Sequence, residues 1–236
     1  MRDMFLNAYA FNQPIGTSQL NNMSEMFRKV TSFNQHIGEC DTSQATRMSG
    51  MFRDAYSFNQ PIGGWDTKQV RYMNTMFISA TSFNQQIGNW DTAQVQHMGG
   101  MFAFASSFNQ PIGDWETSQM TRMDYLFRSA TEFNQPIGDW DTSQVKTMFY
   151  MFLDATSFNH HIDGWNVNQV TNMQDMFNEA SNFNQCLSSW AYKTPDNVRT
   201  GDVLTNTNCP NGVDTPDATV GPWCKGVDEQ CVAMYG

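Results

Sequence analysis

The hydrophobic positions of this chain recur in one pattern with a fixed period. The clearest copy runs from Trp65 to Asn89 and reads Trp-Asp-Thr-Lys-Gln-Val-Arg-Tyr-Met-Asn-Thr-Met-Phe-Ile-Ser-Ala-Thr-Ser-Phe-Asn-Gln-Gln-Ile-Gly-Asn, and the next copy begins at Trp90. Self-similarity of this kind indicates a repeat architecture. One repeat cannot bury its apolar side chains alone, so we expect successive copies to cover one another. The Phe-Asn pair marks a 25-residue period, with 22 residues between its first two copies, and begins at Phe11, Phe33, Phe58, Phe83, Phe108, Phe133, Phe158 and Phe183.

The first half of each repeat has the spacing of a helix. From Val70 to Ala80 the apolar residues stand at i, i+3, i+6, i+7 and i+10, which forms one stripe at helical period. Asp66 precedes this stripe as an N-cap, Gln69 completes a variant of the capping box, and Trp65 begins a hydrophobic staple. We therefore predict a helix of about a dozen residues in each repeat. The predicted helix caps are Asp66, Asp91, Glu116 and Asp141.

The second half of each repeat predicts a short strand. Phe83, Ile87 and Trp90 alternate there with turn-forming residues. Proline cannot donate a ladder hydrogen bond, so the strand must avoid the proline position and stay short, around Ile-Gly-x-Trp. The pattern predicts an α/β protein, a leucine-rich-repeat-like solenoid of about eight 25-residue strand–helix repeats over residues 1–190. Twenty-five residues lies within the 20–29 of leucine-rich repeats.

The full motif resembles a known family. Phe-Asn-Gln-x-Ile-Gly-x-Trp-Asp-Thr-Ser-x-Val-x-x-Met-x-x-Met-Phe-x-x-Ala is similar to the BspA-like surface-protein repeat, also found in mycoplasma lipoproteins, and the similarity covers residues 1 to about 190. The resemblance implies a leucine-rich-repeat-like fold with the Phe–Ile–Trp arm on the concave side and the helix on the convex side. It also implies a surface-exposed or secreted protein linked with adhesion and protein binding.

Residues 191–236 lose the period and predict a C-terminal cap. This segment is rich in Pro, Asn, Asp, Thr and Gly. Two disulfides could hold the cap to the last repeat, and they imply an oxidising, extracellular setting. The sequence leaves all three pairings open. Zinc is a weaker alternative because there is no Cys-x-x-Cys pair and no nearby His. The disulfide candidates are Cys186, Cys209, Cys224 and Cys231.

Charge and composition exclude several classes of function. The net charge is −10 and the pI about 4.6, whereas nucleic-acid binding needs a basic patch and anionic membranes attract basic segments. No apolar run approaches the roughly 18 residues of a membrane span. The chain starts in mid-repeat at Met1-Arg2-Asp3-Met4-Phe5, which predicts a fragment of a longer protein. We expect no enzyme, metal or cofactor, because no triad, metal spacing or phosphate loop involves the scattered His36, His97, His160 and His161.

The remaining columns of identical residues allow both structural and functional interpretations. The Met columns and the Trp column are interpreted as core rather than as a metal site or an exposed glycan-binding ladder. The acidic column is interpreted as helix caps rather than as calcium ligands. The invariant Asn is expected to satisfy backbone groups of neighbouring repeats. The predicted core residues are Trp65, Trp90, Trp115, Trp140 and Trp165, and the candidate binding face is the Gln column, Gln60, Gln85, Gln110 and Gln135.

We expect a non-enzymatic extracellular protein that binds another protein or a cell surface. The alternative is a structural subunit that docks onto other copies or subunits of an extracellular assembly. A third possibility is ice or crystal binding through regular Thr or Gln columns, or glycan binding. A ligand binder should concentrate its column-breaking residues on one face. A structural subunit should expose apolar surface at its ends or along an edge.

Overall fold

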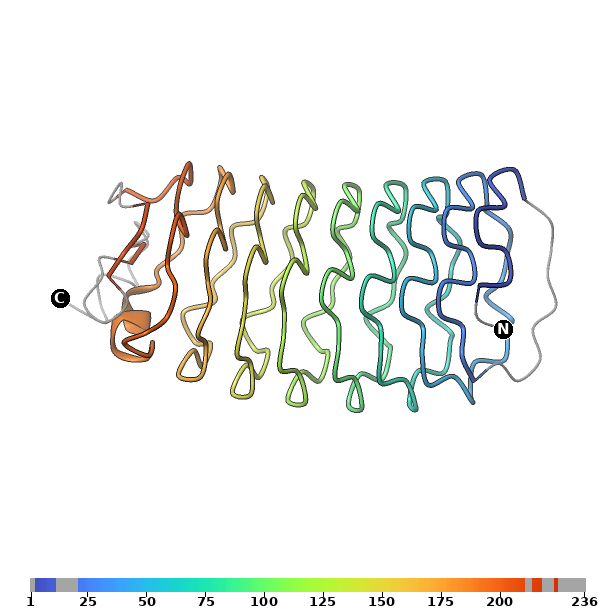
Figure 1. Cartoon of the computed structure of the whole chain (residues 1–236), viewed down its shortest axis with the longest axis horizontal. Helices are drawn as coiled ribbons and strands as arrows, with labels where there is room; N and C mark the ends of the chain where they lie inside the picture. The colour runs from blue at the N-terminus through green and yellow to red at the C-terminus, as the bar shows by residue number, and fades with distance from the viewer. Residues whose placement is uncertain (1–2, 12–20, 211–213, 218–222, 225–236) are drawn as a thin grey trace.

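The computed structural model describes residues 3–11, 21–210, 214–217 and 223–224. Its repeats form a row of flattened coils that lie side by side along one axis, from blue at one end to red at the other (Figure 1). Each coil holds one 25-residue repeat, so equivalent residues of neighbouring coils are adjacent. The regular coils cover residues 40–64, 65–89, 90–114, 115–139, 140–164 and 165–189.

The predicted α/β strand–helix solenoid is wrong. The described residues contain no α-helix and no β-strand, and their one helical element is η1, a 3-10 helix at Ser188–Tyr192. The segment predicted as a helix is a succession of tight turns, in which Met76 N donates to Met73 O at 3.2 Å and Ala80 N to Phe77 O at 3.0 Å. Successive turns whose hydrogen bonds join residues three positions apart return every third or fourth side chain to the interior, as a helix does, so the apolar spacing fits both.

The other N–H groups of these turns bond to the next coil. Thr75 N donates to Gly99 O at 3.0 Å, and Phe77 N and Ser79 N pair in the same way with the following repeat. An α-helix would keep all such bonds within itself. Stacking therefore supplies about half of the backbone bonds of this segment. Isolated parallel bridges also join the coils, at Asn22–Arg47, Arg47–Tyr72, Tyr72–His97, Arg122–Thr147, Thr147–Asn172 and Asn172–Arg199.

Two residues of each coil adopt the left-handed conformation. In the coil 65–89 they are Thr75 and Ser79, with φ of 60° and 57°. This conformation costs a residue other than glycine about 1–2 kcal/mol. Among the described residues glycine takes one of these positions only at Gly50 and Gly100. The strain recurs in every coil and lies in the turns that follow the first Met of the motif.

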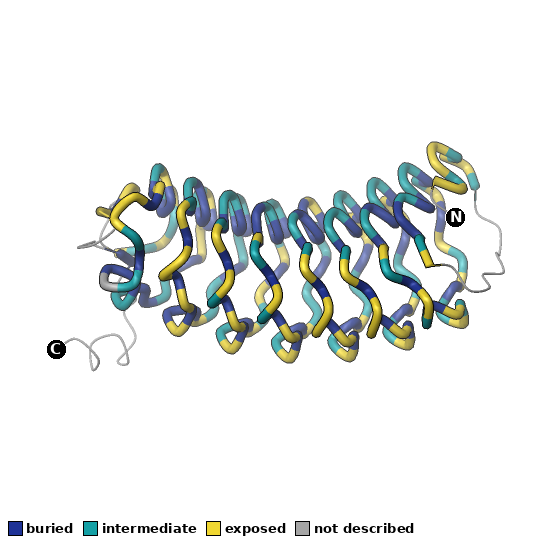
Figure 2. Tube along the Cα trace, turned by 60° about the horizontal axis from the view of Figure 1, so that its bottom comes forward, coloured by how far each residue is buried: buried dark blue, intermediate teal, exposed yellow. Residues whose placement is uncertain are grey.

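The core is a continuous stack of aromatic rings and methionines inside the coils, where Figure 2 shows the buried residues. Phe77 stacks on Phe83 of its own coil with ring centroids 3.9 Å apart, and on Phe102 of the next coil at 5.8 Å. The Trp column runs parallel to this stack, with Trp90 6.4 Å from Trp115. Burial of each coil's rings depends on the neighbouring coils. The predicted core residues are 1–4% exposed, namely Trp65, Trp90, Trp115, Trp140 and Trp165.

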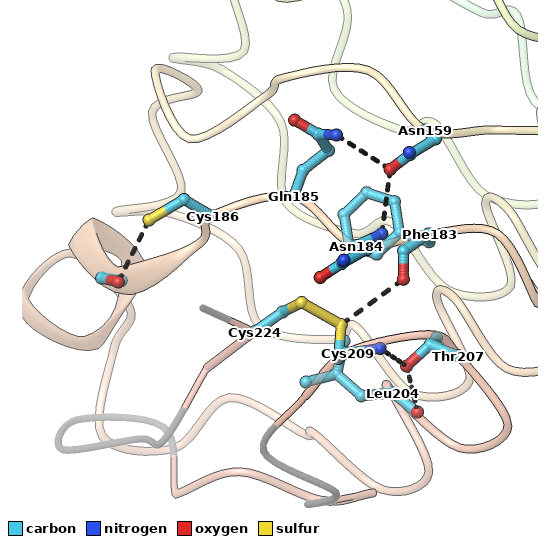
Figure 3. Close-up of a disulfide and its surroundings, with 10 residues drawn as sticks. Asn159, Phe183, Asn184, Gln185, Cys186, Leu204, Thr207, Cys209 and Cys224 are labelled. Carbon is cyan, nitrogen blue, oxygen red and sulfur yellow. Dashed lines mark hydrogen bonds between the residues drawn. A yellow bond between two sulfur atoms is a disulfide. The ribbon is translucent and has the colours of Figure 1, made fainter. Parts of the chain in front are cut away.

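A disulfide joins two residues of the segment that follows the last regular coil. Cys209 is bonded to Cys224, and Cys209 Sγ lies 3.6 Å from Phe183 O of the last regular coil (Figure 3). Cys186 also takes part in a disulfide, whereas Cys231 lies outside the described residues. The turn ladder itself continues past residue 190, because Phe177 N bonds to Val203 O at 2.9 Å. The division of the chain into residues 1–190 and 191–236 stays a prediction.

Candidate binding face

One side of every coil is built around an Asn column without exception and a Gln column with one exception, His160, and these residues bond to one another. Asn84 Oδ1 accepts the N–H of Asn109 at 3.0 Å and the Nε2 of Gln110 at 2.9 Å, and the same pattern repeats along the row. The Asn column therefore satisfies backbone groups of the neighbouring coil, as predicted. We call this the Asn–Gln side. It includes a polar hollow of about 510 Å³ beside Gln85 and Gln110.

The Gln column forms part of this ladder. Its side chains are half-buried, and their amide groups are directed at Asn residues one coil earlier. This bonding stabilises the stack and leaves fewer polar groups of the Gln side chains available to a ligand. The binding role of Gln60, Gln85, Gln110 and Gln135 stays a prediction.

The acidic column stabilises turns rather than helices. Asp66 Oδ1 accepts the N–H of Lys68 at 3.1 Å, an Asx turn, and Asp91 accepts in the same way from Ala93. Because the described residues contain no α-helix, the predicted helix caps at Asp66, Asp91, Glu116 and Asp141 are wrong in that role. The hydrogen bond from the Ser143 backbone N–H, followed by one from its side chain, lowers the pKa of Asp141. The Ser43 hydroxyl and N–H likewise lower the pKa of Asp41.

The Thr column does not form an exposed array. Thr67 is 1% exposed, and its Oγ1 donates to Asp91 O at 2.9 Å. The equivalent Thr42, Thr92, Thr117 and Thr142 are buried in the same way. This column therefore offers no flat surface of hydroxyl groups to ice.

A second side of the coils carries the residues that change from repeat to repeat. It comprises the positions between the buried residues of the turn ladder. Adjacent coils place unlike side chains there, for example Tyr72, His97 and Arg122 at one position. The departures from the repeat pattern are thus concentrated on one face. We call it the variable face, and in the coil 65–89 it consists of Arg71, Tyr72, Asn74, Thr75, Ile78 and Ser79.

The left-handed positions also lie on the variable face. Large side chains occupy some of them, including Phe104, Tyr125 and Tyr150 at φ of 57–59°. Glycine would be the least strained residue there. Bulky rings at strained positions suggest a requirement for the side chain itself, because strain tends to collect at functional sites.

Two hollows of the variable face share Tyr72. The first, of about 670 Å³, is lined by Arg47, Lys68 and Arg71, and we call it the basic hollow. The second, of about 530 Å³, has Ile78, Ala103, Phe104 and Tyr125 in its lining, and we call it the aromatic hollow. Gly99, Gly100 and Ala103 leave room for the second hollow where other coils hold larger residues, such as Asn74, Thr75 and Ile78.

The ladder between coils is interrupted at the aromatic hollow. At this position Met73 N and Met123 N each donate to the next coil, to His97 O and Thr147 O. The corresponding bond from Met98 N to Arg122 O is missing among the described residues, as is the bridge between His97 and Arg122. A stack of side chains in which Arg47 lies over Tyr72, and Tyr72 lies on His97, ends here.

Two arginines are held at this hollow in different ways. Arg122 Nε donates to Asp124 Oδ2 at 2.8 Å, and Asp124 is only 6% exposed whereas the Arg122 side chain is 66% exposed. Arg128 lies over the rings of Phe104 and Tyr150, at 5.0 and 5.6 Å from their centroids. It makes no ion pair with any described residue, and its buried Nε, like those of Arg28 and Arg53, has no hydrogen-bond partner.

The described part of the chain holds no candidate metal centre. No group of three or more His, Cys, Asp or Glu side chains there is arranged to hold a metal ion. Nor do the described residues include a helix with the length and apolar character that a membrane span requires. Of the histidines considered in the sequence, His97 has its ring stacked on that of Tyr72.

A comparison with protein families identifies the chain. A family model described as "Mycoplasma protein of unknown function, DUF285" matches residues 1–113 and residues 101–201. The chain belongs to this family. The two DUF285 matches cover the stacked coils, and the family description assigns no activity. No match was found among curated proteins or among solved structures.

The variable face was not among the residues that sequence reasoning singled out. Its signal is nevertheless present in the aligned DUF285 repeats, because the columns that differ most lie between the Met, Met-Phe and Ala columns. The pair Gly99-Gly100 followed by Ala103 is the clearest such departure, since three small residues replace larger ones within one repeat.

Proposed function

We propose that this chain is a non-enzymatic extracellular or cell-surface protein that binds its ligand on the variable face. The supporting observation is the distribution of sequence differences among the coils. The Asn–Gln side repeats the same bonded residues, whereas neighbouring coils present different side chains on the variable face. Extended faces of stacked repeats are well suited to protein ligands.

The cellular location is part of the same proposal. The Cys209–Cys224 disulfide fits an oxidising compartment. Membership of a Mycoplasma repeat family is compatible with a surface protein, and a relationship to BspA-like adhesins would extend it. The acidic overall charge favours a protein ligand over nucleic acid.

The test compares two triple variants for binding to a panel of purified extracellular proteins and immobilised glycans. The first changes exposed residues of the variable face, Arg71→Ser, Phe104→Ser and Arg122→Ser. The second changes exposed residues in the same three coils on the Asn–Gln side, Gln86→Ser, Asp114→Ser and Asp139→Ser. We expect the first variant to lose affinity by about tenfold or more and the second to bind as the wild type does.

Loss of binding only in the Asn–Gln variant would contradict the assignment of the face. Failure of the wild type to bind anything in the panel would contradict the function itself. The melting temperature of each variant is the folding control. Five of the six exposed side chains have no buried ion-pair partner, and surface substitutions of this kind typically change stability by less than about 0.5 kcal/mol. Loss of Arg122 leaves the buried Asp124 with its bonds from Thr147 and the Phe149 N–H, so the first variant is compared at a temperature where its melting curve shows it folded.

One observation favours the structural alternative. The first described coil exposes large apolar side chains at Met4, Leu6 and Tyr9. Apolar surface at the end of a row of coils can be covered by another chain. Sedimentation over a range of protein concentrations tests this, because an assembly subunit should associate through that end and Leu6→Glu should abolish the association.

A further inference from the structure

The charge of the variable face is opposite to that of the whole chain. The basic hollow is lined by Arg47, Lys68 and Arg71 with one carboxylate, Asp91. The aromatic hollow adds Arg122 and Arg128, and its one carboxylate, Asp124, is already bonded to Arg122. The two hollows thus carry an excess of positive charge on a protein of net charge −10. Such local clustering attracts an anionic ligand.

This positive surface extends further along the row of coils. A hollow of about 440 Å³ shares Arg122 with the aromatic hollow and is also lined by Arg199 and Asn172. Consecutive hollows therefore share a residue, first Tyr72 and then Arg122. A ligand that occupies all three must be elongated and lie along the axis of the stack.

The lining of the aromatic hollow decides between kinds of anionic ligand. Ile78, Ala103 and Phe104 are apolar, and the glycines beside them offer no side chains. Polar side chains such as Asn74, Thr75 and His97 also line the hollow, but most of the surface that it exposes is apolar, which suits a bulky apolar group better than a ring covered in hydroxyl groups. A bulky apolar side chain gains free energy from covering this surface, at about 25 cal/mol for each Å² of apolar area buried.

Arg128 has the features of an unfilled carboxylate receptor. Two other arginines at the same position of their coils, Arg28 and Arg53, lie near carboxylates, with Arg28 Nη1 2.6 Å from Glu25 and Arg53 Nε 3.7 Å from Asp54. Arg128 makes no such pair among the described residues and rests on aromatic rings. A guanidinium held in this way can take a carboxylate in two parallel hydrogen bonds.

We propose that the basic and aromatic hollows together bind an acidic peptide segment of another protein, with a bulky apolar residue in the aromatic hollow. Carboxylates of the segment pair with Arg71 and Lys68 on one side and with Arg128 on the other. This inference rests on the proposed binding function and specifies its site and its ligand class.

The probe is the peptide Glu-Glu-Glu-Trp-Glu-Glu-Glu with a fluorescent label, which places acidic residues on both sides of one large ring. Binding is measured by fluorescence anisotropy at two salt concentrations. Three controls accompany it: the same peptide with Ser for Trp, a peptide with Lys for Glu, and a sulfated oligosaccharide. We expect only the first peptide to bind well, and its affinity to fall as salt rises.

Two variants test the two hollows separately. Arg71→Glu reverses a charge of the basic hollow, and Lys146→Glu is its matched control, because Lys146 is exposed at the same position three coils later. Ala103→Ile fills the aromatic hollow with the residue that Ile78 provides at this position one coil earlier, so the fold accommodates it. We expect Arg71→Glu and Ala103→Ile each to weaken the peptide by about tenfold or more, and Lys146→Glu to have little effect.

The outcomes separate this inference from the proposed function. Equal binding by the wild type and both hollow variants, or no peptide binding at all, would overturn the peptide site. Preference for the sulfated oligosaccharide would overturn it in favour of an anionic glycan. In each of these cases the proposed function would still stand if a ligand from the protein and glycan panel bound the wild type but not the variable-face triple variant.

Discussion

Replacement of Trp90 tests the physical basis of the stack. The Trp90 ring is 3% exposed and lies between Trp65 and Trp115, with 6.4 Å between centroids on each side. Its Nε1 donates to Ile62 O at 3.1 Å. Trp90→Ala removes both the buried ring and this bond, so we expect it to lower the free energy of unfolding by about 4 kcal/mol.

Trp90→Phe separates the two contributions. It keeps most of the buried ring and loses the hydrogen bond. Ile62 O still accepts the backbone N–H of Trp65 at 3.1 Å, so no carbonyl is left without a partner. We therefore expect a cost of only about 1 kcal/mol, the net value of one hydrogen bond.

The assay is urea unfolding followed by tryptophan fluorescence, with the slope of the transition compared between variants. Trp65→Ala is an internal control, because the preceding coil has the half-buried Cys40 instead of Trp at this position and the ring has one Trp neighbour fewer. It should cost less than Trp90→Ala. Equal losses from Trp90→Ala and Trp90→Phe, or a loss below about 1 kcal/mol from Trp90→Ala, would refute the view that ring burial dominates.

Four further perturbations address other features. Asn84→Ala should cost about 1–2 kcal/mol in chemical unfolding, because Asn109 N–H loses its acceptor; no change would show that water replaces Asn84. Ser129→Gly should raise the melting temperature by relieving φ of 53°, worth about 1 kcal/mol, and a lower melting temperature would contradict this. Cys209→Ser opens a loop of 15 residues and should cost about 3 kcal/mol relative to the oxidised wild type, with no difference expected under reduction. The pKa of the Asp141 carboxyl is lower in the folded state than its ordinary value of 3.8. The stabilisation that the ionised carboxylate gives to the fold is therefore complete above about pH 3.8 and is lost as the pH falls through the folded-state pKa. Asp141→Asn should flatten this part of the stability–pH curve.

The sequence was sufficient to predict the repeat and its period, but not the backbone conformation within each repeat. Val70, Met73, Met76 and Ala80 recur at spacings of three and four residues, which describes a helix and a series of tight turns equally well. The difference lies in where the alternate N–H groups bond, and in this chain they bond to residues about 24 positions later. Local propensity does not contain that information, because the partner is another repeat.

The candidate site was missed for a related reason. Reasoning from unchanging columns draws attention to residues such as Gln85 and Gln110, whose uniformity reflects bonding between coils. The residues that form the hollows, such as Ala103 and Phe104, appear in single repeats and are irregular in the pattern. Their proximity depends on which turns face outward, which the helical interpretation placed incorrectly. The Cys209–Cys224 pairing was likewise one of three that the sequence allowed.

The register between coils has a consequence for how such a chain can change over generations. Each coil bonds to its neighbour through equivalent atoms at a constant offset, and the bonded residues are nearly the same in every coil. A genetic exchange that adds, removes or transposes a whole 25-residue unit would therefore join coils that still fit. Duplication and recombination could lengthen the row or reorder the variable face in one step, so new binding surfaces can arise without new solutions to folding.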